Sequence, residues 1–206
     1  MILYKDTLKH CQTLEKEFDQ IPSERKDILR SLSDYIQGKI EQGETPRINV
    51  ICTHNSRRSH LGAIWMAAAA NYYKLPEVET YSGGTAATAF NRNAVSALKR
   101  FGFDVSVSEE KTNNPRYHIS WSDEMVPYQA FSKKYDDAPN PVKGFAAVMV
   151  CTDAEEACPN VAGAEFKLSI PFSDPKASDG TGREEQTYDD ACRQIGREAL
   201  FAFSRV

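Results

Sequence analysis

One stretch of the chain brings a thiol, three hydroxyls and two guanidinium groups together: Cys52-Thr53-His54-Asn55-Ser56-Arg57-Arg58-Ser59. It follows a short apolar run typical of a buried strand, 47–52, and precedes a segment with one apolar face typical of a helix, 59–73. In such a turn the main-chain N–H groups, together with the unpaired N–H groups that begin the helix, form an anion site. We therefore expect residues 53–59 to hold an oxyanion close to the sulfur of Cys52.

The side chains of this turn suit a tetrahedral oxyanion. The positive field at the turn favours the thiolate form of Cys52, which is the nucleophilic form. Arg58 can present a planar fork to two oxygens, and Ser59 can donate a hydrogen bond to the sulfur. Asn55 tolerates left-handed backbone angles and can fix the loop. The alternative is a surface turn with a core cysteine at the strand end, but so polar a segment is unusual for a packed corner.

The pattern Cys52-Thr53-x-Asn55-Ser56-x-Arg58-Ser59 resembles the phosphate loop of the low-molecular-weight protein tyrosine phosphatases and of the thioredoxin-coupled arsenate reductases built on the same fold. Within that group it is most similar to the reductase branch. The resemblance runs from about residue 47 to the C-terminus, roughly three quarters of the chain. Two positions depart from the family pattern: His54 stands where glycine is common, and Arg57 where a small residue or cysteine is common.

A thiolate that attacks phosphate or arsenate expels an oxygen leaving group, which a nearby carboxylic acid should protonate. The candidate is Asp174, which precedes Pro175 in a loop after the apolar run 166–170. An isolated Asp-Pro step is usually only a turn. The resemblance supports the assignment, because the family carries its acid in an Asp-Pro step of the corresponding loop.

The cysteine count is five, an odd number that argues against a secreted disulfide framework, and no Cys-x2-Cys pair indicates a zinc site. Cys151 ends the apolar run 145–151, and parallel strand ends gather at one sheet edge, so Cys151 can approach Cys52. Cys158 follows seven residues later. Both thiols could also be inert. Cys11 and Cys192 fall on apolar helix faces, and we expect them to pack in the core.

The resemblance implies a role for the pair Cys151 and Cys158, because thiol pairs at this spacing mark the reductase branch. Cys52 would attack arsenate, Cys151 would attack Cys52 as arsenite leaves, and Cys158 would attack Cys151 and pass the disulfide to the surface. Thioredoxin would then reduce it by exchange. No metal and no organic cofactor is required.

The elements that must position these groups alternate between strands and helices. Residues 1–45 are expected to form an N-terminal helical arm, and 46–206 the catalytic domain. The expected strands and helices of that domain are strands 47–52, 78–81, 145–151 and 166–170 and helices 59–73, from Asn91 or Asn93 to 102, and from 182 onward. This pattern predicts an α/β fold of three layers, a four-stranded parallel sheet with helices on both faces. Ser82-Gly83-Gly84 is expected to be a turn, and 103–144 shows no readable organisation.

The composition is ordinary for a globular protein, with 206 residues, 41% hydrophobic and 26% charged. Its 25 basic and 29 acidic residues give a net charge of −4, which offers no electrostatic basis for binding nucleic acid or an anionic membrane. The longest weakly polar run, 61–70, is about half of the ~20 residues that a membrane span needs. The charged N-terminus lacks a signal-peptide core, so a cytoplasmic location is expected.

Three functions fit these observations. The first is arsenate reduction with thioredoxin as the electron donor, although a glutathione-type reductant remains open. The second is hydrolysis of phosphotyrosine or small phosphate esters through a phosphocysteine intermediate, with the other two thiols idle. The third is a non-enzymatic redox sensor or oxyanion-binding regulator, which would have no use for the acid Asp174. The sequence leaves the oligomeric state open.

Overall fold

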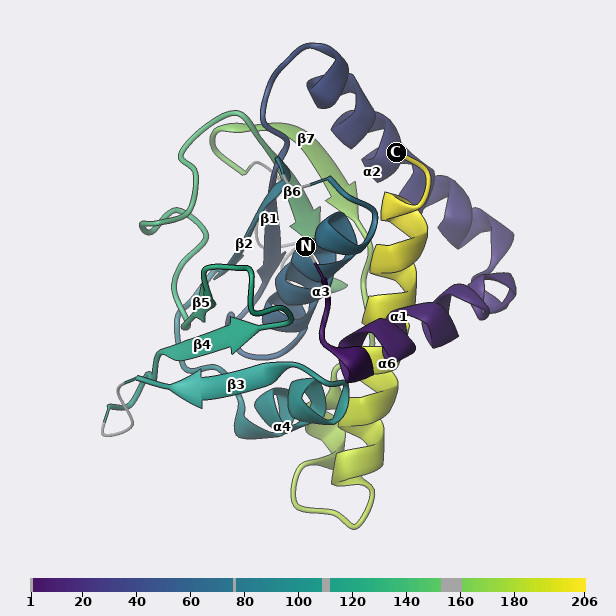
Figure 1. Cartoon of the computed structure of the whole chain (residues 1–206). Helices are drawn as coiled ribbons and strands as arrows, with labels where there is room; N and C mark the ends of the chain where they lie inside the picture. The colour runs from purple at the N-terminus through teal and green to yellow at the C-terminus, as the bar shows by residue number, and fades with distance from the viewer. Residues whose placement is uncertain (1, 76, 109–111, 153–160) are drawn as a thin grey trace.

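The fold is known from a computed structural model, which describes residues 2–75, 77–108, 112–152 and 161–206. At its centre is a four-stranded sheet in the order β2-β1-β6-β7 (Figure 1). All three strand pairs are parallel, which confirms the predicted α/β class. The strands are β1 (Arg47–Cys52), β2 (Glu79–Gly84), β6 (Phe145–Met149) and β7 (Ala164–Ser169).

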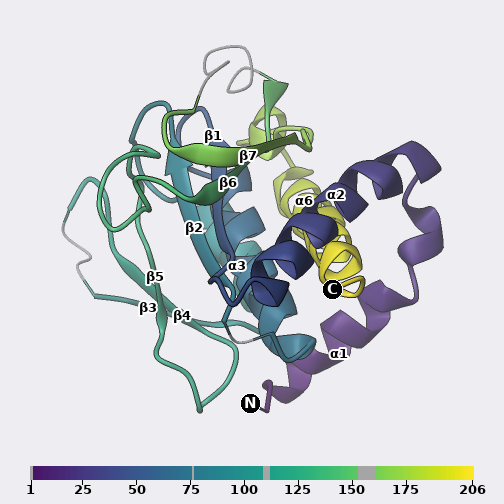
Figure 2. The same cartoon turned by 90° about the horizontal axis from the view of Figure 1, so that it is seen from above.

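The two faces of the sheet are covered differently. Val50 of β1 faces helix α3 (Arg58–Tyr72), where a Cβ atom on Gly62 would come within 2.9 Å of the Val50 side chain. Its neighbour Asn49 points to the opposite face and donates a hydrogen bond to the main-chain oxygen of Tyr135 (2.9 Å). Figure 2 shows the helices gathered on one side of the sheet. In the described part of the chain, the segment after β5 packs on the second face at Tyr135, whereas the sequence predicted helices on both faces.

Helix α6 (Glu184–Phe203) joins the other helices into one core, because it contacts α1, α2, α3 and α4. The bounds of the others are α1 (Lys5–Glu15), the 3-10 turn Phe18–Gln20, α2 (Ser23–Glu41) and α4 (Arg92–Arg100). The apolar faces expected of the first two helices are buried, for example at Leu14 and Leu32. They belong to the same hydrophobic cluster as the sheet. That residues 1–45 form an arm distinct from a catalytic domain of 46–206 stays a prediction.

A second sheet lies in the region that the sequence left unread. It is antiparallel, in the order β3-β4-β5, with β3 (Asp104–Val107), β4 (Tyr117–Ser120) and β5 (Tyr128–Ala130). Its strands are only three to four residues long, too short for a readable hydrophobic period. No helix in the described ranges has the length and apolarity needed to cross a membrane.

The expected turn at Ser82-Gly83-Gly84 is wrong, because these residues complete β2 and pair with Val50, Ile51 and Cys52 of β1. The glycines serve close backbone approach instead. A Cβ atom on Gly83 would lie 2.3 Å from the Tyr135 Cα, and one on Gly84 would lie 2.7 Å from the main-chain nitrogen of Asn55. Gly84 therefore lets the last residue of β2 pack directly against the loop that follows β1.

Candidate active site

The sulfur of Cys52 lies at the end of β1, where the side chain is 4% exposed, and 3.1 Å from the hydroxyl oxygen of Ser59 in the first turn of α3. The side-chain amide of Asn55 donates a hydrogen bond to the same hydroxyl oxygen (2.9 Å). An amide NH2 group only donates, so the Ser59 oxygen is the acceptor in that bond and keeps its own proton. The arrangement therefore directs the Ser59 hydroxyl proton at the Cys52 sulfur.

The carbonyl groups of the loop are held by bonds from neighbouring segments. The carbonyl of Thr53 accepts from the main chain of Ala86, that of Ser56 from Asn91, and that of His54 from the hydroxyls of Thr88 and Ser132. The main-chain N–H groups of residues 53–57 donate to no acceptor within the described part of the chain. Because their carbonyls are fixed by neighbouring segments, these N–H groups are free to bind an anion.

Asn55 adopts the left-handed conformation expected for it, with φ of 44°. Its side-chain oxygen accepts a hydrogen bond from the main-chain N–H of Lys133 (2.8 Å). One side chain therefore links the loop, the serine that contacts the sulfur, and the segment after β5. This bond spans 78 residues of sequence, and no local pattern indicates it.

Arg58 and Asp174 meet beside the sulfur. One terminal nitrogen of Arg58 donates to the main-chain oxygen of Phe172 (2.9 Å) and the other to the carboxylate of Asp174 (2.6 Å). Arg58, Asp174, Cys52 and the loop line one small cavity. Asp174 also caps the short 3-10 helix Pro175–Ser178, where its second oxygen accepts from the main-chain N–H of Lys176 (3.0 Å). The structure thus brings a thiol, a guanidinium and a carboxylate to one site.

Cys151 follows the neighbouring strand β6 and is 1% exposed. Its sulfur lies 3.4 Å from the hydroxyl of Thr53, the residue next to Cys52. A second thiol therefore reaches the same loop. Cys158 lies outside the described residues.

No family model matches the chain. The arsenate reductase of Halalkalibacterium halodurans is 28% identical over 138 residues, which cover 67% of this chain and 80% of the relative. The arsenate reductase of Bacillus subtilis (strain 168) is 29% identical over 145 residues, covering 70% and 85%. The crystal structure of the low-molecular-weight protein tyrosine phosphatase from T. tengcongensis matches 78% of this chain and 99% of that one, with a TM-score of 0.51 at 16% identity.

The chain has the low-molecular-weight phosphatase fold. Its sequence is similar to arsenate reductases. Both groups of relatives are enzymes, and the phosphatase fold accounts for the parallel sheet and the strand-loop-helix unit around Cys52.

The two residues that depart from the family pattern, His54 and Arg57, both line the small cavity around Cys52. The side chain of His54 is exposed. The Arg57 guanidinium donates to the Tyr188 hydroxyl (2.6 Å) and to the Asp179 carboxylate (2.9 Å). The expectation that Arg57 binds an oxyanion therefore applies to its main-chain N–H alone. Its guanidinium instead connects the loop after β1 to α6 and to the segment that follows Asp174.

The other thiols and the histidine after the loop are core residues. Cys11 and Cys192 are completely buried, as expected, and burial raises the pKa of each thiol to about 12. His60 is also completely buried; its ring lies against Phe90 with 4.1 Å between centroids, and Nδ1 is 3.1 Å from the Ser82 hydroxyl. Burial lowers the His60 pKa well below its usual value, so the ring is neutral. Within the described residues, no group of three or more His, Cys, Asp or Glu side chains is arranged to hold a metal.

Lys133 is the functional neighbour that sequence reasoning missed. Its side chain is 5% exposed and lies over the Phe131 ring, 4.7 Å from the centroid. Burial, reinforced by the nearby charge of Arg116 and opposed by that of Asp137, lowers the Lys133 pKa from 10.5 to about 8. A partly desolvated ammonium therefore belongs to the residue whose main-chain N–H binds Asn55 of the loop after β1.

This buried charge predicts an unusual dependence of stability on pH. In the folded chain Lys133 releases its proton near pH 8, and in the unfolded chain near its usual value of 10.5. Between these values the unfolded state binds more protons, so the contribution of Lys133 to the free energy of unfolding rises with pH. We expect Lys133→Met to raise the free energy of unfolding by about 2 kcal/mol at pH 7.

Urea denaturation at pH 7 and pH 10.5 checks this expectation. The gain from Lys133→Met should largely disappear at the higher pH. The matched control is Lys134→Met, because Lys134 is exposed and its loss should change stability little at either pH. A gain that is the same at both values would mean that ammonium desolvation is not its cause.

Proposed function

We propose that this chain reduces arsenate to arsenite by a thiol relay that begins at Cys52. The observation that carries the proposal is the contact between the Cys151 sulfur and Thr53, which puts a second thiol beside the candidate nucleophile. A phosphatase resolves its intermediate with water and needs no such thiol. The similarity to two arsenate reductases over two thirds of the chain supports the same function.

In the first step, arsenate binds to the free N–H groups of residues 53–57 and to the Arg58 fork. The Cys52 thiolate attacks arsenic, and one arsenic–oxygen bond breaks. Asp174, in its protonated form, gives its proton to the departing oxygen, which leaves as water. Arg58 already spans the distance to Asp174, so an incoming oxyanion competes with that carboxylate for the guanidinium. The product is a thiol ester of arsenate on Cys52.

In the second step, the thiolate of Cys151 attacks the Cys52 sulfur. The new sulfur–sulfur bond forms as the sulfur–arsenic bond breaks, and its electron pair remains on arsenic, which leaves as arsenite. Cys158 then attacks Cys151, which frees the Cys52 thiolate and leaves a Cys151–Cys158 disulfide. A dithiol reductant such as thioredoxin restores both thiols by exchange. The reaction needs no metal or organic cofactor. A cytoplasmic location suits it, because the thiols must be returned to their reduced form after each turnover.

Hydrolysis of phosphotyrosine or small phosphate esters is the second candidate. Phosphate has the shape and charge of arsenate, and Asp174, which lines the same cavity as Cys52, would give its proton to an alkoxide or phenolate leaving group. The phosphatase fold supports hydrolysis and reduction equally, because both reactions share every step up to the first intermediate on Cys52. The two functions differ only in whether water or Cys151 attacks next.

The test is a paired assay on the full chain. Arsenite formation is measured with arsenate, thioredoxin, thioredoxin reductase and NADPH, and p-nitrophenyl phosphate hydrolysis is measured in parallel. We expect arsenate-dependent NADPH oxidation with a matching yield of arsenite. Ester hydrolysis with no arsenite, whether thioredoxin or glutathione is supplied, would contradict reduction and favour the phosphatase. The Cys192→Ser variant, which can still accept the hydrogen bond from Trp65, should behave as the unmodified chain.

A further inference from the structure

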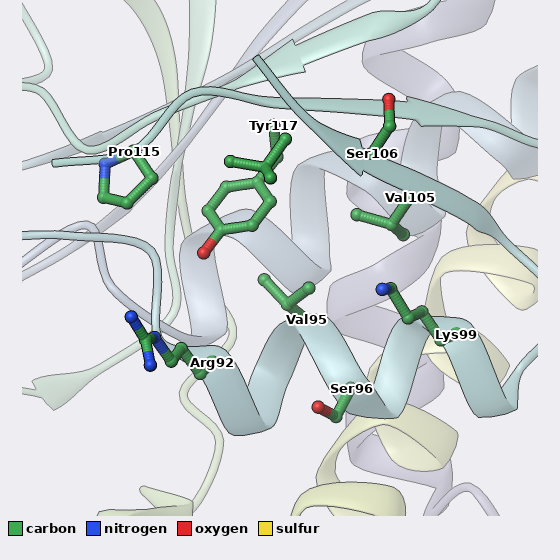
Figure 3. A pocket seen from close by; sticks show the side chains of 9 residues that line it. Arg92, Val95, Ser96, Lys99, Val105, Ser106, Pro115 and Tyr117 are labelled. Carbon is green, nitrogen blue, oxygen red and sulfur yellow. The ribbon is translucent and has the colours of Figure 1, made fainter. Parts of the chain in front are cut away.

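Two adjoining cavities form a groove between α4 and the second sheet. One has a volume of about 420 Å³ and the other about 460 Å³, and both are lined by Arg92, Pro115 and Tyr117. Figure 3 shows the first of them, with α4 along one side and the strand that carries Val105 along the other. Volumes of this size are typical of ligand sites. The cavity in Figure 3 shares no lining residue with the one around Cys52, whereas the second cavity shares Ser56 with it.

Among the described residues that line the groove, the charged ones are positive. Arg92 and Lys99 project from α4 into its rim, and no acidic residue of the described ranges lines either cavity. The adjacent Arg100 pairs with Asp189 (2.7 Å), whereas Arg92 and Lys99 form no ion pair with any described residue. Seven residues on a helix separate the two cations by about 10 Å along its axis. In a chain of net charge −4, this groove favours a ligand with more than one negative group.

Tyr117 provides an independent observation. Its side chain is 8% exposed, and its ring packs edge-on against Phe90 with 5.5 Å between centroids. Its hydroxyl makes no hydrogen bond within the described part of the chain. Figure 3 shows this hydroxyl directed along the cavity toward Arg92. The hydroxyl opens to the cavity, so it can donate a hydrogen bond to a ligand held by Arg92.

The strand beside the groove has an open edge. β3 pairs with β4 alone among the described strands. Because the N–H of Ser108 donates to the carbonyl of Arg116, the alternation of an antiparallel pair directs the main-chain groups of Val105 and Val107 away from β4. Both residues line the cavity. An open edge of this kind can pair with an extended peptide.

We propose that the groove between α4 and β3 docks an extended acidic peptide segment of a partner protein. One carboxylate of the segment binds Arg92 and accepts a hydrogen bond from the Tyr117 hydroxyl, and a second carboxylate binds Lys99. The main chain of the segment pairs with the edge of β3. Apolar side chains of the segment cover Val95 and Val105. A small anion would meet one cation only, whereas an extended acidic segment meets both. This docking does not depend on the reaction at Cys52.

The test uses the isotope-labelled full chain and a blocked peptide that alternates glutamate with valine over six residues. We expect main-chain amide shifts at β3 and α4, weakened as salt concentration rises. Arg92→Gln should weaken binding about tenfold and Tyr117→Phe about threefold. The matched control Arg183→Gln removes another exposed arginine and should leave binding unchanged. All three variants should keep the arsenate or ester turnover of the unmodified chain.

Several outcomes would overturn the proposal. These are no amide shifts at millimolar peptide, equal shifts with the lysine–valine counterpart, unchanged binding by both Arg92→Gln and Tyr117→Phe, or shifts centred on residues 52–59 in place of the groove. Free acetate binding as tightly as the peptide would also overturn it, since that result describes a small-anion site. If the unmodified chain shows no arsenate turnover, the proposed function fails, but the peptide-binding test still decides the docking proposal.

Discussion

Replacing Cys52 with Ser is expected to lower both arsenate reduction and p-nitrophenyl phosphate hydrolysis by about 10⁴-fold or more. The sulfur is the attacking atom for either oxyanion, and an alcohol at this position is not ionised at neutral pH. The smaller oxygen still lies within reach of the Ser59 hydroxyl, so the loop should keep its conformation. Initial rates with both substrates, and the melting temperature, measure the effect and the integrity of the fold.

The control for this loss is Cys11→Ala, which removes another buried thiol, one that packs in the core away from the loop. It should lower stability, by about 1 to 2 kcal/mol, and leave both rates per folded molecule unchanged. Cys52→Ser should show the reverse, a nearly unchanged melting temperature and no turnover. Substantial turnover of either substrate by Cys52→Ser would remove Cys52 from the role of nucleophile.

Replacing Cys151 with Ser is expected to abolish arsenate turnover and to spare ester hydrolysis. The second thiol takes part only after the intermediate on Cys52 has formed, so the first step should proceed at a similar rate. Serine retains a hydroxyl within reach of Thr53, which contacts the Cys151 sulfur at 3.4 Å. Arsenite release under multiple turnover and p-nitrophenol release measure the two activities separately.

Cys192→Ser again provides the comparison, because it replaces a buried cysteine that contacts Trp65 and not the loop. It should retain both activities. Normal arsenate reduction by Cys151→Ser would rule out the relay, and equal loss of both activities would indicate a structural role for Cys151 in the loop.

The local parts of the site and of the fold could be predicted from the sequence. The apolar run at β1, the polar loop and the start of α3 are contiguous, so their chemistry and their order are visible together. Asn91 was one of two expected caps for α4, and its side chain accepts hydrogen bonds from the N–H groups of Asn93 and Ala94. Strand β6 is apolar throughout because both of its faces are covered, which makes it readable as a buried strand.

The rest depends on contacts between distant segments. Ser82-Gly83-Gly84 has the composition of a turn, yet the approach of Tyr135 and of the loop after β1 makes glycine necessary within a strand. The bond between Lys133 and Asn55 and the direction of the Arg57 guanidinium toward Tyr188 arise only from packing. No period or motif in the sequence indicates any of these contacts.

A single-turnover experiment on the Cys158→Ser variant tests the relay most directly. The variant is reduced, freed of reductant and mixed with excess arsenate, and then arsenite is quantified and the disulfide-linked peptides are identified by mass. The relay predicts about one arsenite per chain and a disulfide between Cys52 and Cys151, trapped because the third thiol is missing. Arsenite without that disulfide, or no arsenite from a variant that still hydrolyses p-nitrophenyl phosphate, would contradict it.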